Sequence, residues 1–372
     1  MSEPSVRPFE ERDWPDMVRF YEEFYRPGYV FTRRAFFDWN FSSPLRPGAA
    51  SGQRLALDGD RIIGIMGSLP WPLQVAGRQE LGEYNINLFV DPAYRGARIG
   101  QRLLASVSSG YSYSLTNGYN ARTLSTYERL GRVHHWEMRR FVKCLDGDRT
   151  QELLADSPRF SRLEPRDRES TLARLRESGG ISLGAPELPV AEERAFDAGW
   201  DRAWEEIRRH YGFTTWRSSA FLNWRYARYP SPLYRCFSAG SPPRGLCVLR
   251  VETPPCGTIV RIVDLVGDRA PRRALLAHAE EMAAGRAALF IDCVCAGETD
   301  DALLAAAGYR EFQAPDGAML LPMDFAPPRH RDRVLALATF LDVDDPGNDE
   351  FKAGRFYAVK GDGDLDRANQ PG

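Results

Sequence analysis

The first 145 residues alternate between short apolar runs and longer amphipathic stretches. Apolar residues recur as they do in strands at residues 6–9, 54–57, 62–66, 84–90, 111–115 and 135–142. Stretches with a helical period end at Tyr25 and occupy residues 33–41, 99–108 and 123–130. Asp58, Gly59 and Asp60 are typical of a hairpin turn between two of the runs. This order predicts an α/β fold whose mixed, mostly antiparallel sheet is flanked by helices.

Part of the pattern returns further along the chain. The aromatic segment Phe36–Phe41 is similar to Phe221–Tyr226, and strand-like runs follow both segments. Two copies of one fold explain the repeat, and chance similarity between two aromatic amphipathic helices is the alternative. The division that we predict is a first domain at residues 1–145, a charged linker at 146–187, a second domain at 188–325 and a C-terminal extension at 326–372.

Composition narrows the class of function. The chain has 372 residues, enough for two or three domains, and its formal net charge is −2. That charge argues against a nucleic-acid partner, because such partners bind basic surfaces. No apolar run approaches the ~18–20 residues of a membrane span, and the first residues do not resemble a secretion signal. We therefore expect a cytoplasmic protein without a nucleic-acid or membrane partner, and we leave a homodimer open.

Metal chemistry is not indicated. The six cysteines include no C-x-x-C pair, and no histidine is spaced to complete a zinc site. The acidic tail at residues 356–367 lacks the downstream ligand of a calcium-binding loop. We expect this tail to be a solvated turn, and we expect no metal.

The segment between Val90 and Leu104 carries the strongest chemical signal. A strand ends at Val90, a turn rich in arginine and glycine follows, and an amphipathic helix begins near Ile99. Unpaired N–H groups at a helix start suit a pyrophosphate, and glycine lets the backbone come close to it. The arginines that can add charge-assisted contacts are Arg95, Arg98 and Arg102. A solvated basic helix start is the alternative interpretation.

This segment resembles the acyl-CoA signature of the GNAT N-acetyltransferase superfamily, Arg/Gln-x-x-Gly-x-Gly/Ala, with Arg95 as its first member and Gly100 as its last. Arg98 replaces the middle glycine. The later segment Asn120–Gly131 resembles the motif of that family in which Asn precedes a helix ending in Tyr-Glu-Lys-Leu-Gly. The resemblance implies tandem GNAT folds, with acetyl-CoA or another acyl-CoA as co-substrate.

The resemblance also implies roles for individual residues. Tyr127 would protonate the leaving thiolate, with a packed aromatic residue as the alternative. Glu83 is the candidate general base, although an exposed glutamate at a strand end is the ordinary interpretation; His134 and His135 are weaker candidates. The residues expected to contact the cofactor, through backbone or side chain, are Leu88, Phe89, Val90, Arg95, Gly96, Ala97, Arg98, Ile99, Gly100, Gln101 and Asn120.

The second copy lacks both motifs. Residues 267–273 contain no glycine pair, and the helix before Gly308 has no counterpart of Asn120 or Tyr127. We expect a degenerate copy that does not bind CoA. The function that we predict is transfer of an acetyl or other acyl group from CoA to the amine of a small molecule, with an amino sugar as one candidate. A protein or peptide N-acetyltransferase and a non-catalytic GNAT-fold binding module are the alternatives.

Overall fold

The chain folds into two units, each built from segments that are not contiguous in the sequence. The computed structural model describes residues 4–41, 52–108, 110–119, 121–230, 234–325, 328–329 and 333–366. The first unit comprises residues 1–135, 336–349 and 363–372, and the second comprises residues 136–335 and 350–362.

The first unit contains a mixed sheet in which the strand order is β1-β2-β3-β4-β5-β17-β6. Its strands from β1 to β4 pair antiparallel, β4 and β5 pair parallel, and β17 pairs antiparallel with β5. The elements, in chain order, are β1 (Ser5–Pro8), α1 (Trp14–Phe24), α2 (Arg34–Phe41), β2 (Gln53–Asp58), β3 (Arg61–Val75), β4 (Arg78–Val90), α3 (Ile99–Ser108), β5 (Tyr113–Asn117), α4 (Ala121–Tyr127), β6 (Arg132–Glu137) and β17 (Leu335–Phe340).

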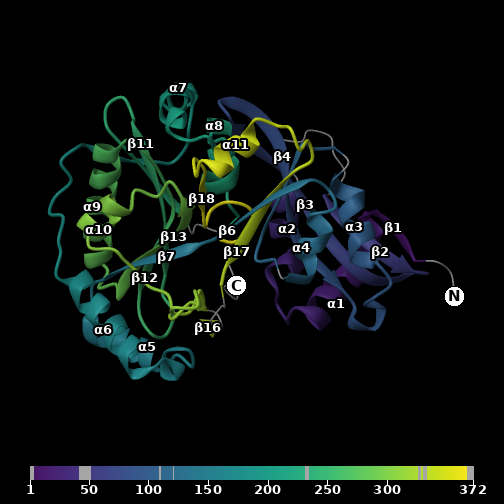
Figure 1. Cartoon of the computed structure of the whole chain (residues 1–372), viewed down its shortest axis with the longest axis horizontal. Helices are drawn as coiled ribbons and strands as arrows, with labels where there is room; N and C mark the ends of the chain where they lie inside the picture. The colour runs from purple at the N-terminus through teal and green to yellow at the C-terminus, as the bar shows by residue number, and fades with distance from the viewer. Residues whose placement is uncertain are drawn as a thin grey trace. The chain divides into compact units, whose positions relative to one another are not determined.

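The second unit contains a sheet in which the strand order is β14-β7-β13-β12-β11-β10-β8, with β18 also paired to β13. Its helix α9 lies across β10, β11 and β12 (Figure 1). The boundary between the last segments of the two units falls within α11 (Gly347–Lys352). The other elements are β7 (Arg139–Cys144), α5 (Gly147–Ala155), α6 (Pro165–Gly179), β8 (Val190–Glu193), α7 (Ala198–Ile207), β9 (Phe213–Thr215), α8 (Ser219–Leu222), β10 (Tyr234–Ala239), β11 (Gly245–Glu252), β12 (Ile259–Gly267), α9 (Arg269–Ala284), β13 (Phe290–Gly297), α10 (Asp301–Ala306), β14 (Arg310–Glu311), β15 (Asp324–Phe325), β16 (Pro328–Arg329) and β18 (Tyr357–Val359).

The two units repeat one order of elements. In each, a strand and two helices precede three antiparallel strands, and a helix then leads to a parallel strand. The repeated aromatic segments, Phe36–Phe41 and Phe221–Tyr226, occupy the same place in both: the first lies in α2, and the second runs from α8 into one turn of π-helix. The expected tandem α/β architecture is confirmed.

Each sheet also contains a strand from a distant part of the chain. β17, close to the C-terminus, pairs with β5 in the first sheet, and Phe340 lies opposite Tyr113. β7 directly follows β6 in the sequence but pairs with β13 in the second sheet, where Cys144 lies opposite Phe290. In both sheets, the strand next to the second member of the parallel pair (β5 or β13) thus comes from a distant part of the sequence.

These pairings correct the contiguous domains expected from the sequence. The single strand expected at residues 135–142 is two strands, β6 and β7, in different sheets. Residues 146–187, expected as a linker, form α5 and α6, and Leu154 and Leu175 from these helices are buried in the core of the second unit. Residues 326–372, expected as an extension, contribute β17 and β18 to the two sheets. Strand pairing over a long sequence distance leaves no local signal, so the boundaries could not be read from composition.

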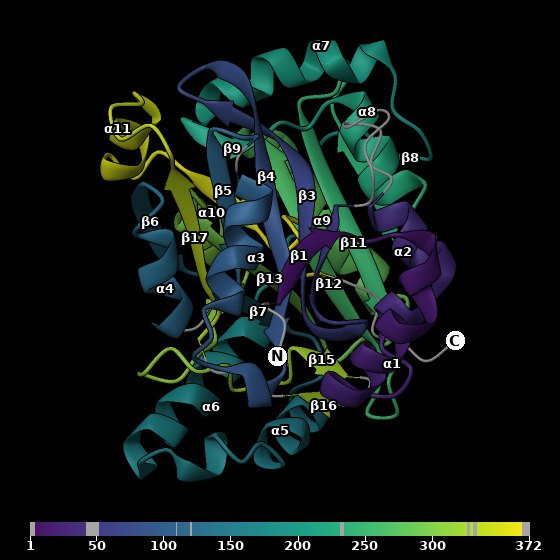
Figure 2. The ribbon, with the colours of Figure 1, turned by 90° about the vertical axis from the view of Figure 1, so that its right-hand side faces the viewer.

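Helix α3 is fixed on the first sheet by an apolar stripe. Ile99, Leu103 and Leu104 are buried against Ile63 and Met66 of β3. Burial of each such side chain is worth roughly 1.5–3 kcal/mol. Figure 2 shows α3 lying across β3 and β4. This packing fixes the point at which α3 begins, beside the end of β4.

The hairpin of β3 and β4 is longer than expected. The sequence indicated strands at residues 62–66 and 84–90, whereas β3 extends to Val75 and β4 begins at Arg78. Pro70 and Pro72 lie within β3, and proline in a run of residues argues against a strand because it cannot donate to the ladder. The connecting turn uses Ala76 and Gly77, both with positive φ.

Candidate functional site

The two parallel strands of the first sheet part soon after they pair. β4 and β5 are in register only from Glu83 to Asn85 on β4, opposite Ser114 to Thr116 on β5. β4 then continues to Val90, and among the strands that the structure describes none pairs with this last part on the side away from β3. The parting opens one edge of β4 in the middle of a sheet.

A β-bulge lies at the point of parting. The register between β3 and β4 shifts by one residue between Ile65 and Gly67, and Asn87 has a φ of +53°. A bulge bends its strand and re-aims the residues that follow. Leu88, Phe89 and Val90 consequently line a cleft beside the open edge.

The turn after β4 is held by an aspartate. Asp91 accepts a hydrogen bond from the N–H of Ala93 at 2.9 Å and forms an ion pair with Arg61 at 2.7 Å. The chain then passes through Gly96, whose φ is +95° and beside which a Cβ would meet no atom within 4 Å. The turn therefore reaches α3 without closing the cleft.

Arg98 has the backbone conformation that a glycine would normally take. Its φ is +57°, in the left-handed region that costs a non-glycine residue about 1–2 kcal/mol. Its carbonyl oxygen accepts the N–H of Arg102 at 3.1 Å, so Arg98 immediately precedes the first turn of α3. The N–H groups of Ile99, Gly100 and Gln101 are the orphan donors of that turn, and no backbone acceptor for them lies among the described residues. The replacement of glycine by arginine thus preserves the backbone path and adds a guanidinium.

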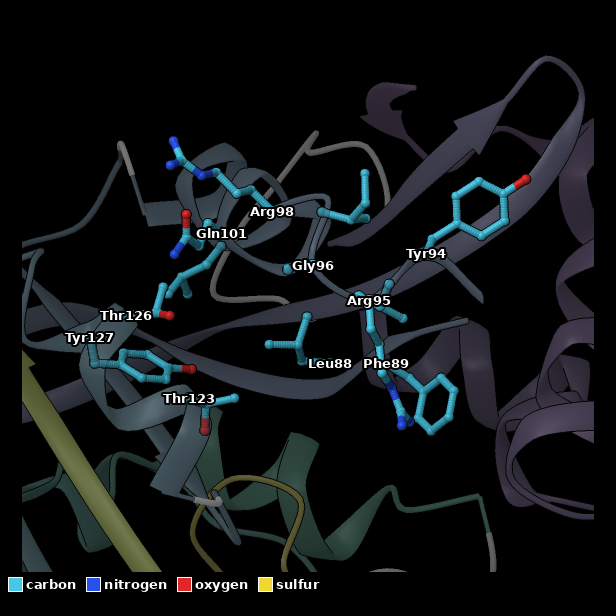
Figure 3. Close-up of a pocket in the computed structure, with 14 residues that line it drawn as sticks. Leu88, Phe89, Tyr94, Arg95, Gly96, Arg98, Gln101, Thr123, Thr126 and Tyr127 are labelled. Atoms are coloured by element: carbon cyan, nitrogen blue, oxygen red, sulfur yellow. The ribbon is translucent and has the colours of Figure 1, made fainter. Parts of the chain in front are cut away.

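These elements surround a cleft of about 550 Å³. In Figure 3, Arg98 and Gln101 point toward the side on which Thr126 and Tyr127 lie, whereas Arg95 points the other way. The lining residues are Leu88, Phe89, Val90, Tyr94, Arg95, Gly96, Arg98, Ile99, Gly100, Gln101, Leu104, Thr123, Thr126 and Tyr127.

The cleft is basic. Arg95 and Arg98 are exposed, and within the described part of the chain neither has a carboxylate partner. The lining includes no aspartate or glutamate. Together with the N-terminal end of α3, this arrangement favours an anion, because the helix dipole and the two guanidinium groups have the same sign.

Tyr127 lies at the other side of the cleft, at the end of α4. Its side chain is 3% exposed, and burial raises the pKa of its hydroxyl well above the ordinary value. Hydrogen bonding to the Thr116 and Asn85 side chains opposes that rise in pKa, and the negative charge of Glu83 adds to it. A tyrosine hydroxyl already holds its proton at neutral pH, and the raised pKa extends this protonated form, which a proton donor needs, to higher pH.

Glu83 is buried in β4, close enough to Tyr127 for its charge to act on the tyrosine hydroxyl, and does not lie at an exposed strand end. Its side chain is fully buried in the middle of β4, where Ser68 donates a hydrogen bond to it at 2.6 Å. The Asn85 amide donates to Glu83 at 3.5 Å and to the Ser114 hydroxyl at 2.6 Å. The alternative interpretation, an exposed glutamate at a strand end, is wrong, because β4 begins at Arg78, five residues before Glu83, and the side chain is buried within the sheet.

The structure brings most of the predicted cofactor residues into one cleft. Residues 88–90, Arg95, Gly96, residues 98–101 and Tyr127 all line it, whereas Ala97 and Glu83 do not. Asn120 lies outside the described residues. Sequence reasoning missed Tyr94, Leu104, Thr123 and Thr126. Helical spacing could have found two of them, because Leu104 follows Gly100 by one turn and Thr123 precedes Tyr127 by one turn.

The two candidate histidines lie elsewhere in the first unit. The ring of His134 is 2.8 Å from the amide oxygen of Asn348 and packs edge-on against Phe340 at 5.3 Å. His135 is exposed on β6. Neither residue lines the cleft.

In the second unit the corresponding gap is filled by the chain itself. β12 and β13 pair in parallel from Ile259 to Ile262 on β12 and then part. β18 pairs with β13, and the following Lys360 and Gly361 donate backbone hydrogen bonds to Val294 of β13 and Val263 of β12, both at 2.9 Å.

The start of α9 in the second unit also differs from that of α3. Asp268 precedes α9, and its carboxylate contacts Arg244 and, at 3.0 Å, His210. A carboxylate in this place opposes an anion by charge repulsion.

The aspartates of the acidic tail, which the structure describes as far as residue 366, are buried and not solvated as expected. Asp362 is 4% exposed, and it accepts hydrogen bonds from the Thr215 hydroxyl at 2.6 Å and from the Val359 N–H at 2.8 Å. The Asp362 carboxylate is therefore bound by groups of the second unit and not by solvent. Across the described ranges, no cluster of three or more His, Cys, Asp or Glu side chains could hold a metal ion.

No family model and no curated protein matches the sequence. Solved structures do match. A GCN5-related N-acetyltransferase from Anabaena variabilis is 13% identical with a TM-score of 0.54, and the match covers 91% of this chain and 73% of that chain. A GCN5-related N-acetyltransferase from Kribbella flavida is 17% identical with a TM-score of 0.54, over 90% of this chain and 70% of that one. An N-myristoyltransferase from Saccharomyces cerevisiae, solved with bound myristoyl-CoA, is 10% identical with a TM-score of 0.56, and the match covers 91% of this chain and 79% of that chain.

These matches extend over both units, and they show the fold. The chain has two GNAT folds in tandem, each with a mixed sheet flanked by helices. Among the helices that the structure describes, none is long and apolar enough to cross a bilayer.

Proposed function

We propose that the protein is an N-acyltransferase that moves an acyl group, acetyl in the simplest case, from CoA to an amine. The observation that carries this proposal is the basic cleft of the first unit, which joins the start of α3 to the open edge of β4 and to Tyr127. The helix start can hold the phosphates of CoA, the open strand edge can polarise the thioester carbonyl, and the protonated hydroxyl can supply the proton that the departing thiolate takes up.

The residues of the cleft suit CoA by their charge and by the space left at Gly100. The N–H groups that begin α3 and the Arg98 guanidinium would hold the pyrophosphate, and a Cβ at Gly100 would meet only Val90, at 3.9 Å. The bound acyl-CoA would supply the thioester, whose carbonyl carbon the amine attacks. The backbone of Leu88 to Val90 would orient that carbonyl.

Tyr127 and Glu83 would share the proton chemistry. Tyr127 lines the cleft and holds a proton at its hydroxyl oxygen, which suits a general acid for the departing thiolate. Glu83 is fully buried and does not line the cleft. We propose that Glu83 acts as an indirect base through the Ser68 hydroxyl, which passes its own proton to Glu83 as it takes up a proton that comes from the amine, while the Asn85 amide holds the carboxylate in place.

For the acceptor we propose the amine of a small molecule, with an amino sugar as one candidate. An acceptor on a protein or peptide is the second candidate, and the fold shared with an N-myristoyltransferase supports it. Incubation of the protein and acetyl-CoA with amino sugars, simple amines and N-terminal peptides, followed by mass spectrometry of the products, separates the two classes. Acylation of peptides alone would favour the second candidate.

We propose that the second unit is a scaffold that does not bind CoA. The gap between β12 and β13 is filled by residues 357–361, and a carboxylate precedes α9. Both features oppose a pyrophosphate and its pantetheine arm.

The cofactor assignment is tested by thermal stability. A ligand that binds only the native state stabilises it by about 2.7 kcal/mol at one hundred times its Kd, so acetyl-CoA should raise the Tm of the full chain. Arg95→Glu should abolish the rise because it places negative charge in the cleft. Arg132→Glu is the matched control, since Arg132 is exposed in the same unit and does not line the cleft. Absence of any rise with the unmodified protein at millimolar acetyl-CoA would remove the enzyme proposal.

A further inference from the structure

Two tyrosine hydroxyls converge on one residue of the bulge in β4. The Tyr25 hydroxyl donates a hydrogen bond to the backbone carbonyl of Asn87 at 3.0 Å. The Tyr29 hydroxyl donates to the side-chain oxygen of the same asparagine at 2.9 Å. Tyr25 and Tyr29, which follow α1, thereby hold both the backbone and the side chain of Asn87.

The two tyrosines are themselves held in place. Their rings stack with centroids 4.7 Å apart and planes at 21°. Tyr21 packs against both of them at 5.4 Å, and its own hydroxyl donates to Gln53 rather than to the bulge. The hydroxyls of Tyr25 and Tyr29 are thus presented to Asn87 by an aromatic cluster and not by single mobile side chains.

Asn87 needs this support because of its backbone conformation. At a φ of +53° it lies in the left-handed region, which asparagine tolerates better than most residues but which still costs free energy. Loss of the bulge would shift the pairing of β4 by one residue, and such a shift turns every following side chain to the opposite face. The residues that would turn are Leu88, Phe89 and Val90, which line the cleft.

Aromatic residues of α1 and of the segment after it also pack against Phe89, two residues after Asn87. Phe89 lines the cleft, and its ring lies 5.4 Å from Tyr25 and 5.3 Å from Phe24. Leu88 is consequently bracketed by two fixed neighbours, Asn87 and Phe89. The contacts to Asn87 and Phe89 therefore determine how the backbone of Leu88 is oriented at the open edge of β4.

We propose that Tyr25 and Tyr29 are positioning residues for acyl transfer: by holding Asn87 in the left-handed conformation, they aim the backbone at Leu88 toward the thioester carbonyl. This inference rests on the proposed function of the cleft. Neither tyrosine lines the cleft, so their role would be to position the strand and not to contact the cofactor or the reacting atoms. Their effect passes through the backbone of one residue.

The test compares three substitutions that each remove one hydroxyl and keep the ring. Tyr25→Phe and Tyr29→Phe lose a hydrogen bond to Asn87, and Tyr21→Phe is the control, because it loses a hydroxyl of the same cluster that bonds to Gln53. We expect kcat to fall about 10-fold in each of the first two, less than the ~10²–10³-fold typical when an oxyanion donor is removed outright. KM for acetyl-CoA should stay within about 2-fold, because the pyrophosphate site is untouched.

Substitution of Asn87 provides the rescue. Glycine adopts a positive φ freely, so Asn87→Gly should retain most of the activity, and Tyr29→Phe should have no further effect in that background. Asn87→Ala loses the side-chain oxygen and keeps the strain, so it should lower kcat at least as much as Tyr29→Phe. Equal kcat values for Asn87→Gly and Asn87→Ala would overturn the proposal.

A spectroscopic readout separates this inference from the proposed function. Infrared spectra of acetyl-CoA labelled with carbon-13 at the carbonyl report polarisation by backbone donors, with no acceptor needed. We expect the carbonyl band to move to lower frequency on binding, and to move less in Tyr25→Phe and Tyr29→Phe but not in Tyr21→Phe. If the label does not bind at all, the proposed function and this inference both fail. If it binds and its band is the same in all four proteins, only the positioning role fails.

Discussion

Gly361 donates its backbone N–H to the carbonyl oxygen of Val263 at 2.9 Å, across the gap where β12 and β13 part. The neighbouring Lys360 donates to Val294 on the other side of the gap, also at 2.9 Å. In the first unit the cleft lies beside the last residues of β4, after β4 has parted from β5. Two parallel strands thus part in both units, but the space is filled by the chain itself in the second unit and is left as a cleft in the first.

The close approach at Gly361 predicts a stability effect in the second unit. A Cβ at this position would lie 3.0 Å from the Val263 carbonyl and still closer to the Tyr226 hydroxyl. Gly361→Ala should therefore lower the free energy of unfolding by about 1–3 kcal/mol, the usual cost of overpacking. Gly147→Ala is the control, since a Cβ there meets no atom within 4 Å. Chemical denaturation checks the difference, and equal midpoints for the two variants would contradict the proposed tight insertion.

The left-handed conformation of Arg98 predicts that its backbone and side-chain contributions can be separated. Arg98→Gly removes the guanidinium and relieves the backbone strain, whereas Arg98→Ala removes the guanidinium alone. Both should weaken acetyl-CoA binding about 10-fold if the guanidinium meets a phosphate. Only Arg98→Gly should gain stability without ligand, by about 1 kcal/mol.

Calorimetric titration at two salt concentrations measures the binding part of this prediction. The affinity of both variants should depend less on salt than that of the unmodified protein, because one charge pair is missing. Unchanged affinity in Arg98→Gly would mean that the backbone alone holds the anion.

Much of the first unit could be predicted because its signals are local. The hairpin turn at residues 58–60, the amphipathic period of α3 and the turn before it each depend on a few adjacent residues. The repeat of the aromatic helices predicted two similar units for the same reason. The pairing of β7 and β17 could not be predicted, because both strands pair with residues far away in the sequence and their own residues do not indicate the partner.

The candidate site divides along the same line. Residues 95–101 form the turn and helix start by their own chemistry, and the sequence located them. The burial of Glu83 depends on β3 and β5, and the bulge at Asn87 depends on tyrosines some sixty residues earlier, so no local pattern indicated either. The cleft residues Thr123 and Thr126 lie on the same helix as Tyr127, but small polar residues on a helix are not distinctive.

Tyr127 predicts a separation of rate from binding. Tyr127→Phe keeps the ring that packs against α3 and removes only the hydroxyl oxygen. Loss of a general acid typically costs ~10²–10⁴-fold in rate, so turnover should fall while the affinity for acetyl-CoA stays nearly constant. Acetyl-CoA hydrolysis or a panel of simple amines provides the assay. Unchanged turnover with several acceptors would assign this tyrosine to packing.

The raised pKa of Tyr127 predicts the shape of the pH–rate profile. Burial is the largest cause of the rise, Glu83 adds to it, and hydrogen bonding to Thr116 and Asn85 only partly offsets it. A general acid works in its protonated form, and a raised pKa extends that form to higher pH. The turnover number should therefore show no alkaline decline attributable to Tyr127 up to the ordinary tyrosine pKa of 10.0.

The profile should be measured from about pH 6 to about pH 10 with an acceptor amine of low pKa, so that the acceptor stays deprotonated throughout. Arg132→Glu, whose side chain lies outside the cleft, controls for general effects of alkaline pH on the protein. Titration of the tyrosinate absorbance difference between the unmodified protein and Tyr127→Phe gives the same pKa without turnover. A decline centred below 10.0 that is present in the unmodified protein and in Arg132→Glu but absent from Tyr127→Phe would show that the hydroxyl ionises as readily as one in water. In that case the buried environment of Tyr127 could not be what keeps the proton available to the leaving thiolate.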